Sequence, residues 1–316
     1  MVVRKFNYFR FISFIVILIG IIVGIVLFIK KSNYKKTNEY KLLELGYSQI
    51  QISTIEQELN DSQIDKLLTM DYDENIIGLL TEKYFIFDNL DKYLEYKKEK
   101  SNYENSKVVS IINTKANIDW FDYELETDTS KNELMLVNRI YGLSSTYEPK
   151  DIVNIPTQYA YTGKQISKSI LDKIISLIDT AKSSKGYTFV VSEGYRSYKA
   201  QEDIYNFFAD NYGKSDADEI AARPGHSEYQ TGLSFDLVPY NEVIEKPYED
   251  ERYLWLKDNA HKYGFIFRLE KDKENLTGFN ASAWRLRYVG ESAASIMYNE
   301  KICFEEYYAY FVENVD

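Results

Sequence analysis

Three short stretches of this 316-residue sequence hold the side chains best suited to chemistry: GYRSYKAQ at 194–201, PGHSEYQTGLSFDLV at 224–238 and TGFNASAWRLRYVG at 277–290. Arg196 in the first stretch carries a planar guanidinium fork, which matches a carboxylate through two parallel hydrogen bonds. Asp236 in the second stretch is a carboxylate, which needs a cation or hydrogen-bond donors wherever it is buried. These residue types favour a site that recognises the charged end of a ligand.

Together, the three stretches resemble the signatures of the VanY-type D,D- and L,D-carboxypeptidases, a branch of the LAS zinc metallopeptidases that trims peptidoglycan stem peptides. The resemblance covers about residues 134–316. It implies an α+β domain of the LAS/hedgehog type, in which helices flank an antiparallel sheet. It also implies that Arg196 clamps the terminal carboxylate of a stem peptide, and that Gln201 and Ser227 hydrogen-bond the peptide near the same pocket.

The metal and catalytic positions of the family pattern are replaced in this sequence. The first signature, S-x-H-x-x-G-x-A-x-D, keeps its aspartate as Asp236 but has Tyr229 in place of the histidine. In the second signature, E-P-W-H, Ser282 stands at the general-base position and Arg285 at the position of the third zinc ligand. A phenol with a pKa of about 10 is a poor zinc ligand at neutral pH, and a guanidinium cannot bind a cation. Asp236 is therefore the only retained ligand, and no catalytic residue is intact.

The sequence offers few other metal ligands. It contains two histidines, His226 and His261, and one cysteine, Cys303. A single cysteine excludes an intrachain disulfide and a zinc site built from cysteines, and two histidines exclude a histidine-rich metal centre. His226 precedes the lost ligand position by three residues, so on an extended chain its side chain points to the opposite face. We interpret both histidines as structural. We expect no cofactor, and zinc only if the residues present bind it with unusual ligands.

A partly buried Asp236 without a metal would leave a carboxylate uncompensated, which costs several kcal/mol. Arg285 occupies the position of a former ligand, so its side chain starts from backbone that is aimed at the same point in space. We therefore predict that the guanidinium of Arg285 pairs with Asp236, and that the hydroxyl of Tyr229 lies close to the pair.

Three functions are consistent with this pattern. The first is a catalytically inactive carboxypeptidase-like protein of peptidoglycan, or cell-wall, metabolism that still binds stem peptides. The second is an active metallo-carboxypeptidase that trims stem peptides with non-standard ligands. The third is an interaction or scaffold domain with no ligand, which the retained Arg196 disfavours. We expect a stem peptide as the ligand, an active carboxypeptidase or another membrane protein as a candidate partner, and no nucleic acid, because the net charge of -11 leaves no basic face for phosphates.

An apolar run without charges, residues 11–29, lies between Arg10 and the pair Lys30 and Lys31. The run is long enough to cross a hydrocarbon layer of about 30 Å as a helix, and it ends without the small-residue site of a cleaved signal peptide. We predict a single-pass anchor in the cell membrane. Basic residues flank both ends, so the charge rule does not orient it. The resemblance to peptidoglycan enzymes implies a cytoplasmic N-terminus at 1–10 and an extracellular C-terminal domain.

The rest of the chain is expected to divide into a tether and helical stalk module at 30–105, a lead-in segment at 106–155 and the VanY-like domain at 156–316. Apolar spacing and capping patterns predict short helices within 41–100. The β-branched run Val108–Ile112 predicts a strand.

Alternation along the second motif predicts a strand: Leu233, Phe235 and Leu237 would share one face, and Asp236 would point to the other. Patterns around the motifs predict helices near 166–181, 201–212, 255–263 and 303–312. They predict further strands before the GYRS motif, after Gly264, and at 284–289.

Overall fold

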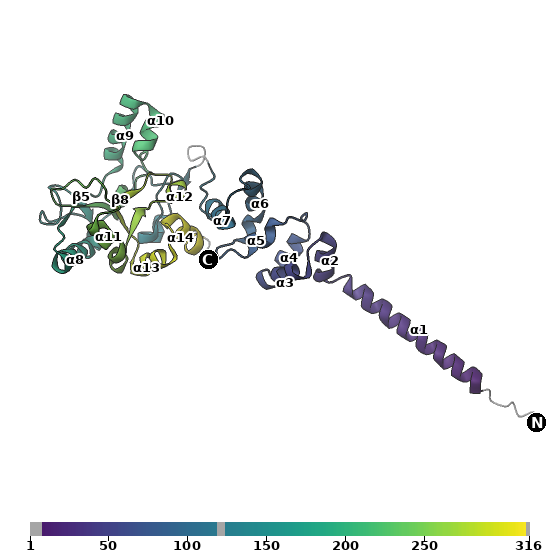
Figure 1. Cartoon of the computed structure of the whole chain (residues 1–316). Coiled ribbons are helices and arrows are strands. Elements are labelled where there is room, and N and C mark those ends of the chain that lie inside the picture. Colours follow the sequence, from purple (N-terminus) through teal and green to yellow (C-terminus); the bar gives the residue numbers. More distant parts are fainter. Residues whose placement is uncertain (1–7, 119–123, 314–316) are drawn as a thin grey trace, which may run out of the picture. The chain divides into compact units, whose positions relative to one another are not determined.

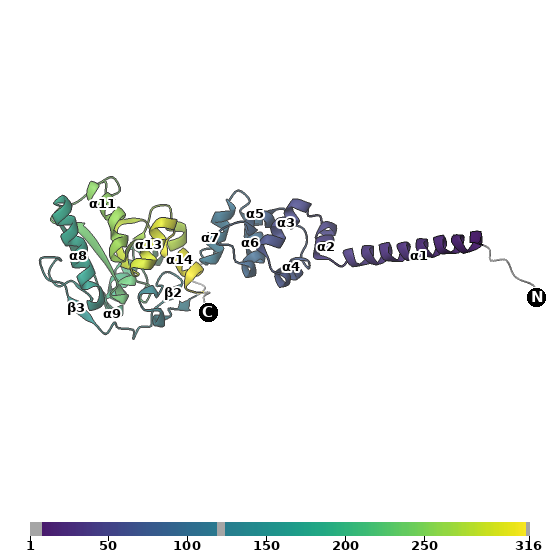
Figure 2. The same ribbon diagram turned by 90° about the horizontal axis from the view of Figure 1, so that it is seen from below.

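The structure, a computed structural model, describes residues 8–118 and 124–313. The chain forms two compact units, Met1–Ser106 and Lys107–Asp316, which are described separately below. Figures 1 and 2 show the elements of both units in two orientations.

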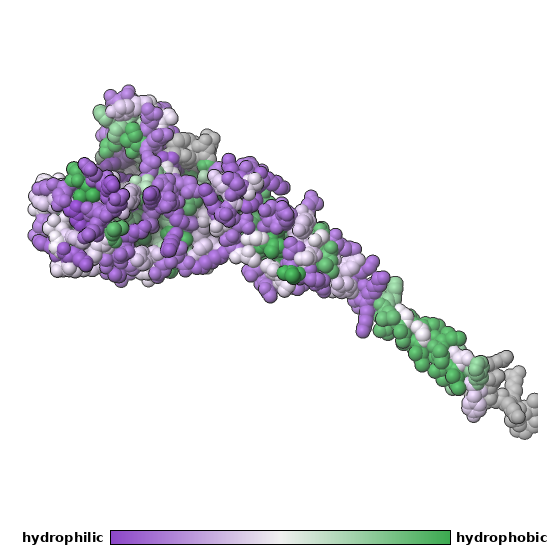
Figure 3. Space-filling model, in the orientation of Figure 1, coloured by the Kyte–Doolittle hydropathy of each residue, from purple (hydrophilic) through white to green (hydrophobic). Residues whose placement is uncertain are grey.

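The first helix, α1 (Tyr8–Tyr34), contains the one segment of the described residues that is long and apolar enough to cross a membrane, Phe11–Tyr34. Its large apolar side chains are exposed and make the helix surface almost uniformly hydrophobic (Figure 3). Length and composition of this kind fit both a membrane anchor and a secretion signal. The single-pass anchor therefore stays a prediction.

Short helices follow α1, as the apolar spacing predicted: α2 (Asn38–Leu45), α3 (Gln49–Glu58), α4 (Asp61–Leu67), α5 (Asn75–Leu80) and α6 (Leu90–Glu99), with a 3₁₀ turn at Phe87–Asn89. Reciprocal capping boxes start two of them, Ser48 with Gln51 in α3 and Asn60 with Gln63 in α4. These boxes satisfy amides that the first turn of a helix leaves free. Buried apolar side chains join the helices into a small core that includes Leu42, Ile55, Ile76, Leu79 and Tyr93.

The predicted strand at Val108–Ile112 is wrong, because this run lies in helix α7 (Asn105–Asn113). β-branched residues disfavour a helix only weakly, and burial readily overrides that preference. The valines and isoleucines of the run are all buried in α7. Ser110 between them donates a hydrogen bond to Glu306 of α14 (Phe304–Phe311) over 2.7 Å. Packing on the C-terminal unit thus decides the conformation of this segment.

Four antiparallel strands form the centre of the C-terminal unit, in the order β5 (Phe189–Glu193), β6 (Ser234–Pro239), β8 (Ser282–Tyr288) and β7 (Phe265–Leu269). The alternation predicted along β6 is confirmed. Leu233, Phe235 and Leu237 belong to the hydrophobic core, whereas Ser234 and Asp236 line a cavity on the opposite face. The sheet therefore separates the packed side of the domain from its polar site.

Helices cover the apolar face and frame the polar one (Figures 1 and 2). α8 (Lys168–Lys185) and α11 (Glu251–Asn259) contribute Ile174, Leu177 and Leu256 to the core. α9 (Tyr198–Tyr212) and α10 (Lys214–Ile220) form a hairpin that projects from the domain. The helices predicted near 166–181, 201–212 and 303–312 are confirmed by α8, α9 and α14, and that near 255–263 by α11 with a 3₁₀ turn at Ala260–Tyr263.

The remaining elements of this unit are short. β1 (Leu125–Glu126) pairs in parallel with β2 (Tyr141–Gly142), and β3 (Ile152–Asn154) pairs antiparallel with β4 (Gln165–Ser167). α12 (Glu274–Thr277) precedes β8, and α13 (Glu291–Glu300) follows it. Further 3₁₀ turns lie at Thr129–Leu134 and Glu228–Thr231.

Candidate functional site

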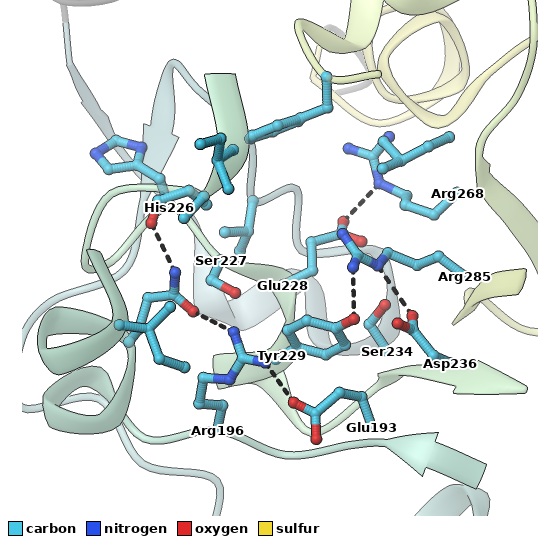
Figure 4. A pocket seen from close by; sticks show the side chains of 18 of the residues that line it. Glu193, Arg196, His226, Ser227, Glu228, Tyr229, Ser234, Asp236, Arg268 and Arg285 are labelled. Atoms are coloured by element: carbon cyan, nitrogen blue, oxygen red, sulfur yellow. Dashed lines mark hydrogen bonds and ion pairs between the residues drawn. The ribbon is translucent and has the colours of Figure 1, made fainter. Parts of the chain in front are cut away.

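A cavity of about 310 Å³ lies on the polar face of the sheet (Figure 4). All three stretches singled out in the sequence contribute to its lining, through Arg196, Gln201, Ser227, Tyr229, Asp236 and Arg285. The α9–α10 hairpin adds an apolar wall with Ile204, Phe208 and Ile220. The cavity thus has a charged floor and one hydrophobic side, a combination typical of sites for small organic ligands.

Arg285 and Asp236 face each other because strand register makes them direct partners across β6 and β8. The guanidinium of Arg285 donates from Nε to Oδ1 of Asp236 over 3.1 Å and from Nη2 to the hydroxyl of Tyr229 over 2.5 Å. The pairing predicted from the sequence is confirmed. The side chain of Asp236 is only 11% exposed, so the pair is largely shielded from water.

Tyr229 lies between two guanidiniums, because those of Arg196 and Arg285 are each centred 4.6 Å from its ring centroid. Burial raises the pKa of the Tyr229 phenol above its ordinary value, so the hydroxyl stays protonated at neutral pH. Burial alone would lower the pKa of Arg285, but Tyr229 and Asp236 raise it above its ordinary value. Arg285 is therefore a permanent cation beside a neutral phenol.

Arg196 follows β5, where its backbone amide donates to the carbonyl of Tyr229 over 3.1 Å. Its Nη1 donates to Oε1 of Gln201 over 2.8 Å, and its Nη2 forms an ion pair with Glu193. Glu193 also pairs with Lys164. Partial burial would raise the pKa of Glu193, but the hydrogen bonds from Lys164 and Arg196 hold it below its ordinary value.

The three predicted ligand-binding residues come together in this cavity, but Ser282 does not join them. Gln201 is fully buried and fixed by a hydrogen bond from its Nε2 to the carbonyl of Ala222 over 2.7 Å, and Ser227 is buried beside it. Ser282 lines a separate pocket of about 330 Å³ with Tyr248 and Lys257.

A buried charge network at the edge of the cavity was not predicted from the sequence. Nε of Arg268 lies 2.8 Å from Oε1 of Glu228, and its Nη1 donates to Oε2 of Glu305 over 3.0 Å. Nη1 of Arg287 lies 3.8 Å from the same oxygen of Glu228. Two arginines thus balance two glutamates, as buried charges require. The signals for this network were the arginine in the otherwise apolar strand β7 and the second arginine of β8, Arg287.

His226 lines the same cavity as Tyr229, contrary to the expectation that its side chain points to the opposite face, but neither histidine lies beside Asp236. Nδ1 of His226 donates to the carbonyl of Asn138 over 2.8 Å, and its Nε2 lies 3.3 Å from Oε1 of Glu124. Figure 4 shows its ring at the opposite side of the cavity from Asp236. His261 lies outside the cavity and stacks on Tyr298 at 3.9 Å between ring centroids.

Comparisons with known proteins agree with this site. The family model described as VanY, D-alanyl-D-alanine carboxypeptidase, matches residues 163–291. The protein YodJ of Bacillus subtilis (strain 168) is 36% identical over 195 residues, which are 58% of this chain and 70% of YodJ. The D-alanyl-D-alanine carboxypeptidase of Enterococcus faecalis (strain ATCC 700802 / V583) is 32% identical over 189 residues, 57% of this chain and 67% of that protein. The chain belongs to the VanY family.

A solved structure of a VanY-type relative supports the fold assignment. The LdcB LD-carboxypeptidase, whose structure reveals the molecular basis of its peptidoglycan recognition, is 35% identical with a TM-score of 0.55, and the match covers 59% of this chain and 90% of LdcB. The α+β fold of the LAS type is therefore confirmed. This VanY domain is carboxypeptidase-like, and it belongs to peptidoglycan metabolism.

The VanY family is zinc-dependent, but the residues present in this chain do not fit a zinc site. Tyr229 and Arg285 stand at two ligand positions of the family signature. Arg285 donates hydrogen bonds to Tyr229 and to Asp236, the third position. A protonated phenol and a guanidinium offer no lone pair suited to Zn²⁺. Within residues 8–118 and 124–313, no three His, Cys, Asp or Glu side chains form a group that could hold a metal ion.

Proposed function

We propose that this chain is a catalytically inactive, membrane-anchored member of the VanY family that binds peptidoglycan stem peptides without cleaving them. The observation that carries the proposal is the contact of Arg285 with both Asp236 and Tyr229. The guanidinium places a fixed cation where the family needs an exchangeable one. Ser282, which stands at the general-base position of the family signature, lines another pocket, and the carboxylates of Glu193, Glu228 and Asp236 in this cavity are each paired with an arginine.

The binding of a stem peptide is supported by Arg196 and by the apolar wall of the cavity. The guanidinium of Arg196 is held by Gln201 and Glu193, so the orientation of its fork does not depend on a ligand. The neighbouring apolar wall of Ile204, Phe208 and Ile220 suits the aliphatic part of a peptide. A bidentate contact between Arg196 and a terminal carboxylate would orient the peptide end toward Tyr229 and Arg285.

The anchor is supported by α1, whose apolar side chains are exposed along its whole length. A domain that binds stem peptides must lie outside the cell membrane, because that is where its ligand is. We therefore place the N-terminus on the cytoplasmic side and the VanY domain on the outer side.

Calorimetry and a turnover assay on the same sample test this function. The full chain, purified in detergent, is titrated with a pentapeptide stem that ends in D-Ala-D-Ala, and free D-alanine is then measured in the cell. We expect saturable binding and no release of D-alanine. Release of D-alanine would favour an active enzyme with unusual ligands, and an absence of binding would favour a scaffold domain with no ligand.

A further inference from the structure

The fork of Arg196 is already occupied by a carboxylate of the same chain. Glu193 forms an ion pair with Nη2 of Arg196, while Gln201 accepts from Nη1 over 2.8 Å (Figure 4). A terminal carboxylate that binds Arg196 through both amino groups shares Nη2 with Glu193, and the two carboxylates repel each other there. Ligand and protein thus compete for one group of donors.

The backbone holds Glu193 in this place. β5 has a register irregularity between Val191 and Glu193, after which Glu193 is paired with Asp236 at the cavity floor. Immediately after it, Gly194 lies so close to the carbonyl oxygen of Gln165 that an added Cβ would approach that oxygen to 2.2 Å. Tyr195 donates its amide to the same carbonyl over 2.7 Å. Glu193 can therefore leave Arg196 only by moving its side chain.

Lys164 is an alternative ion-pair partner for the side chain of Glu193. Its ammonium group pairs with Oε1 of Glu193, whereas Arg196 pairs with Oε2. Glu193 and Lys164 are about one third exposed, so water reaches both of them. If Glu193 moves away from Arg196, Lys164 still compensates the charge of Glu193. The exchange therefore leaves no buried carboxylate unpaired.

The charges on the floor also fit one incoming anion. Arg196 and Arg285 line the cavity with two carboxylates, those of Glu193 and Asp236. Lys164, which does not line it, pairs with Glu193, so these five groups together carry one positive charge in excess. The second network of Arg268 and Arg287 with Glu228 and Glu305 is balanced in itself. One ligand carboxylate would neutralise the floor.

We propose that Glu193 determines which peptide ends this cavity accepts, by competing with the terminal carboxylate of the ligand for Arg196. The proposal rests on the proposed stem-peptide binding. Glu193 weakens the advantage that a free carboxylate would otherwise have over a neutral end, so the cavity also accepts stems whose C-terminus is amidated or continues into another residue. Removal of the charge on Glu193 restores the preference for a free acid.

The test compares two peptides on the full chain in detergent: L-Ala-D-Glu-L-Lys-D-Ala-D-Ala as the free acid and as its C-terminal amide. Calorimetry gives a Kd for each, and the measured quantity is the ratio of the amide Kd to the acid Kd. In Glu193→Gln, the carboxylate of the free-acid peptide can form its charge-assisted hydrogen bond with Arg196 without competition from Glu193, and the amide gains nothing comparable. Glu193→Gln should therefore raise this ratio by about tenfold. Glu202→Gln is the matched control, since Glu202 also pairs with a lysine but does not line the cavity.

Lys164→Met provides a second, independent arm. It removes the alternative partner of Glu193, so Glu193 should hold Arg196 more firmly and the ratio should fall below that of the unsubstituted chain. Ratios within twofold of each other in the unsubstituted chain, Glu193→Gln and Lys164→Met would overturn the role of Glu193 and leave the proposed function intact. If neither peptide binds any of these proteins, the proposed function fails and this inference fails with it.

Discussion

Arg285 places a positive charge 3.1 Å from Asp236, at the position where the family signature has a zinc ligand. The contact gives Asp236 a role that does not depend on a metal ion. A carboxylate that is 11% exposed needs a counter-charge, and Arg285 provides one that does not dissociate. The same contact places a cation beside Asp236, which would repel a metal ion there.

Arg285→Ala should destabilise the VanY domain, because Asp236 would keep its charge and lose its partner. Breaking a buried pair costs about 3–5 kcal/mol, and the partial exposure of Arg285 reduces the expected loss to about 1–3 kcal/mol. Urea denaturation followed by circular dichroism measures the shift in midpoint. The double variant Arg285→Ala with Asp236→Asn should recover part of the loss, and an equal loss in both variants would show that the pair is not the cause.

Arg196→Ala should weaken binding of a free-acid stem peptide by roughly tenfold or more, because a charge-assisted contact is lost. The amidated peptide should be much less affected. Arg252→Ala is a suitable control, since Arg252 of α11 lies outside the cavity and pairs with Asp250 and Glu242. Equal affinities of Arg196→Ala and the unsubstituted chain for the free acid would contradict the role assigned to Arg196.

At the scale of elements, the α9–α10 hairpin depends on one buried carboxylate. Asp218 of α10 accepts a hydrogen bond from the hydroxyl of Tyr205 of α9 over 2.7 Å and two from Arg223, over 2.9 and 2.8 Å. Burial would raise the pKa of Asp218, but these donors hold it below its ordinary value. The hairpin forms the apolar wall of the cavity, so Asp218 stabilises the site indirectly.

Asp218→Asn should lower the stability of the full chain at neutral pH by about 1–3 kcal/mol. Because the folded-state pKa of Asp218 is depressed, its contribution is complete above the unfolded value of about 3.9 and is lost as pH falls through the lower folded value. The stability difference between Asp218→Asn and the unsubstituted chain should therefore be constant from pH 5 to 7 and shrink below about pH 4. Denaturation at several pH values measures it, and a difference independent of pH down to pH 3 would contradict it.

The sequence allowed prediction of those elements whose pattern is set by one buried face. The period of two along β6 and the apolar face of α8 led to correct assignments, because each pattern reflects burial against a single partner layer. Val108–Ile112 was assigned wrongly because four buried β-branched side chains look alike in a strand and in a helix packed on two sides. Local sequence does not contain the contact of Ser110 with Glu306.

The sequence motifs allowed prediction of those cavity residues that lie within the motifs. Arg196, Gln201 and Ser227 were placed in one cavity from their motifs, and the pairing of Arg285 with Asp236 followed from charge compensation. Glu193 was missed, because its neighbour Lys164 lies 29 residues away and a β-bulge determines where its side chain points.

At the scale of the whole molecule, the fate of α1 would determine the cellular location of the helical module and the VanY domain. A segment of this length and hydrophobicity either stays in the membrane or is removed after export, and basic residues on both sides leave its orientation open. Retention fits the proposed binding of peptidoglycan stem peptides outside the membrane. The helical module between α1 and the VanY domain would then act as a spacer.

The full chain should sediment with membranes and resist extraction by alkaline carbonate, because α1 buries its apolar side chains in lipid. A chain that starts after Tyr34 and carries its own start codon should remain soluble in the cytoplasm. Intact mass spectrometry of the membrane fraction is the measurement. A mature N-terminus downstream of α1 would show that the segment is a cleaved signal and not an anchor.

The zinc content of the purified full chain tests the central claim most directly. Metal analysis by plasma mass spectrometry should find far less than one zinc per chain, whereas the triple variant Tyr229→His, Ser282→Glu and Arg285→His should bind zinc, because it restores two ligands beside Asp236. The triple variant also shows that the rest of the pocket is intact. One zinc per unsubstituted chain, together with D-alanine release that a chelator abolishes, would contradict the account.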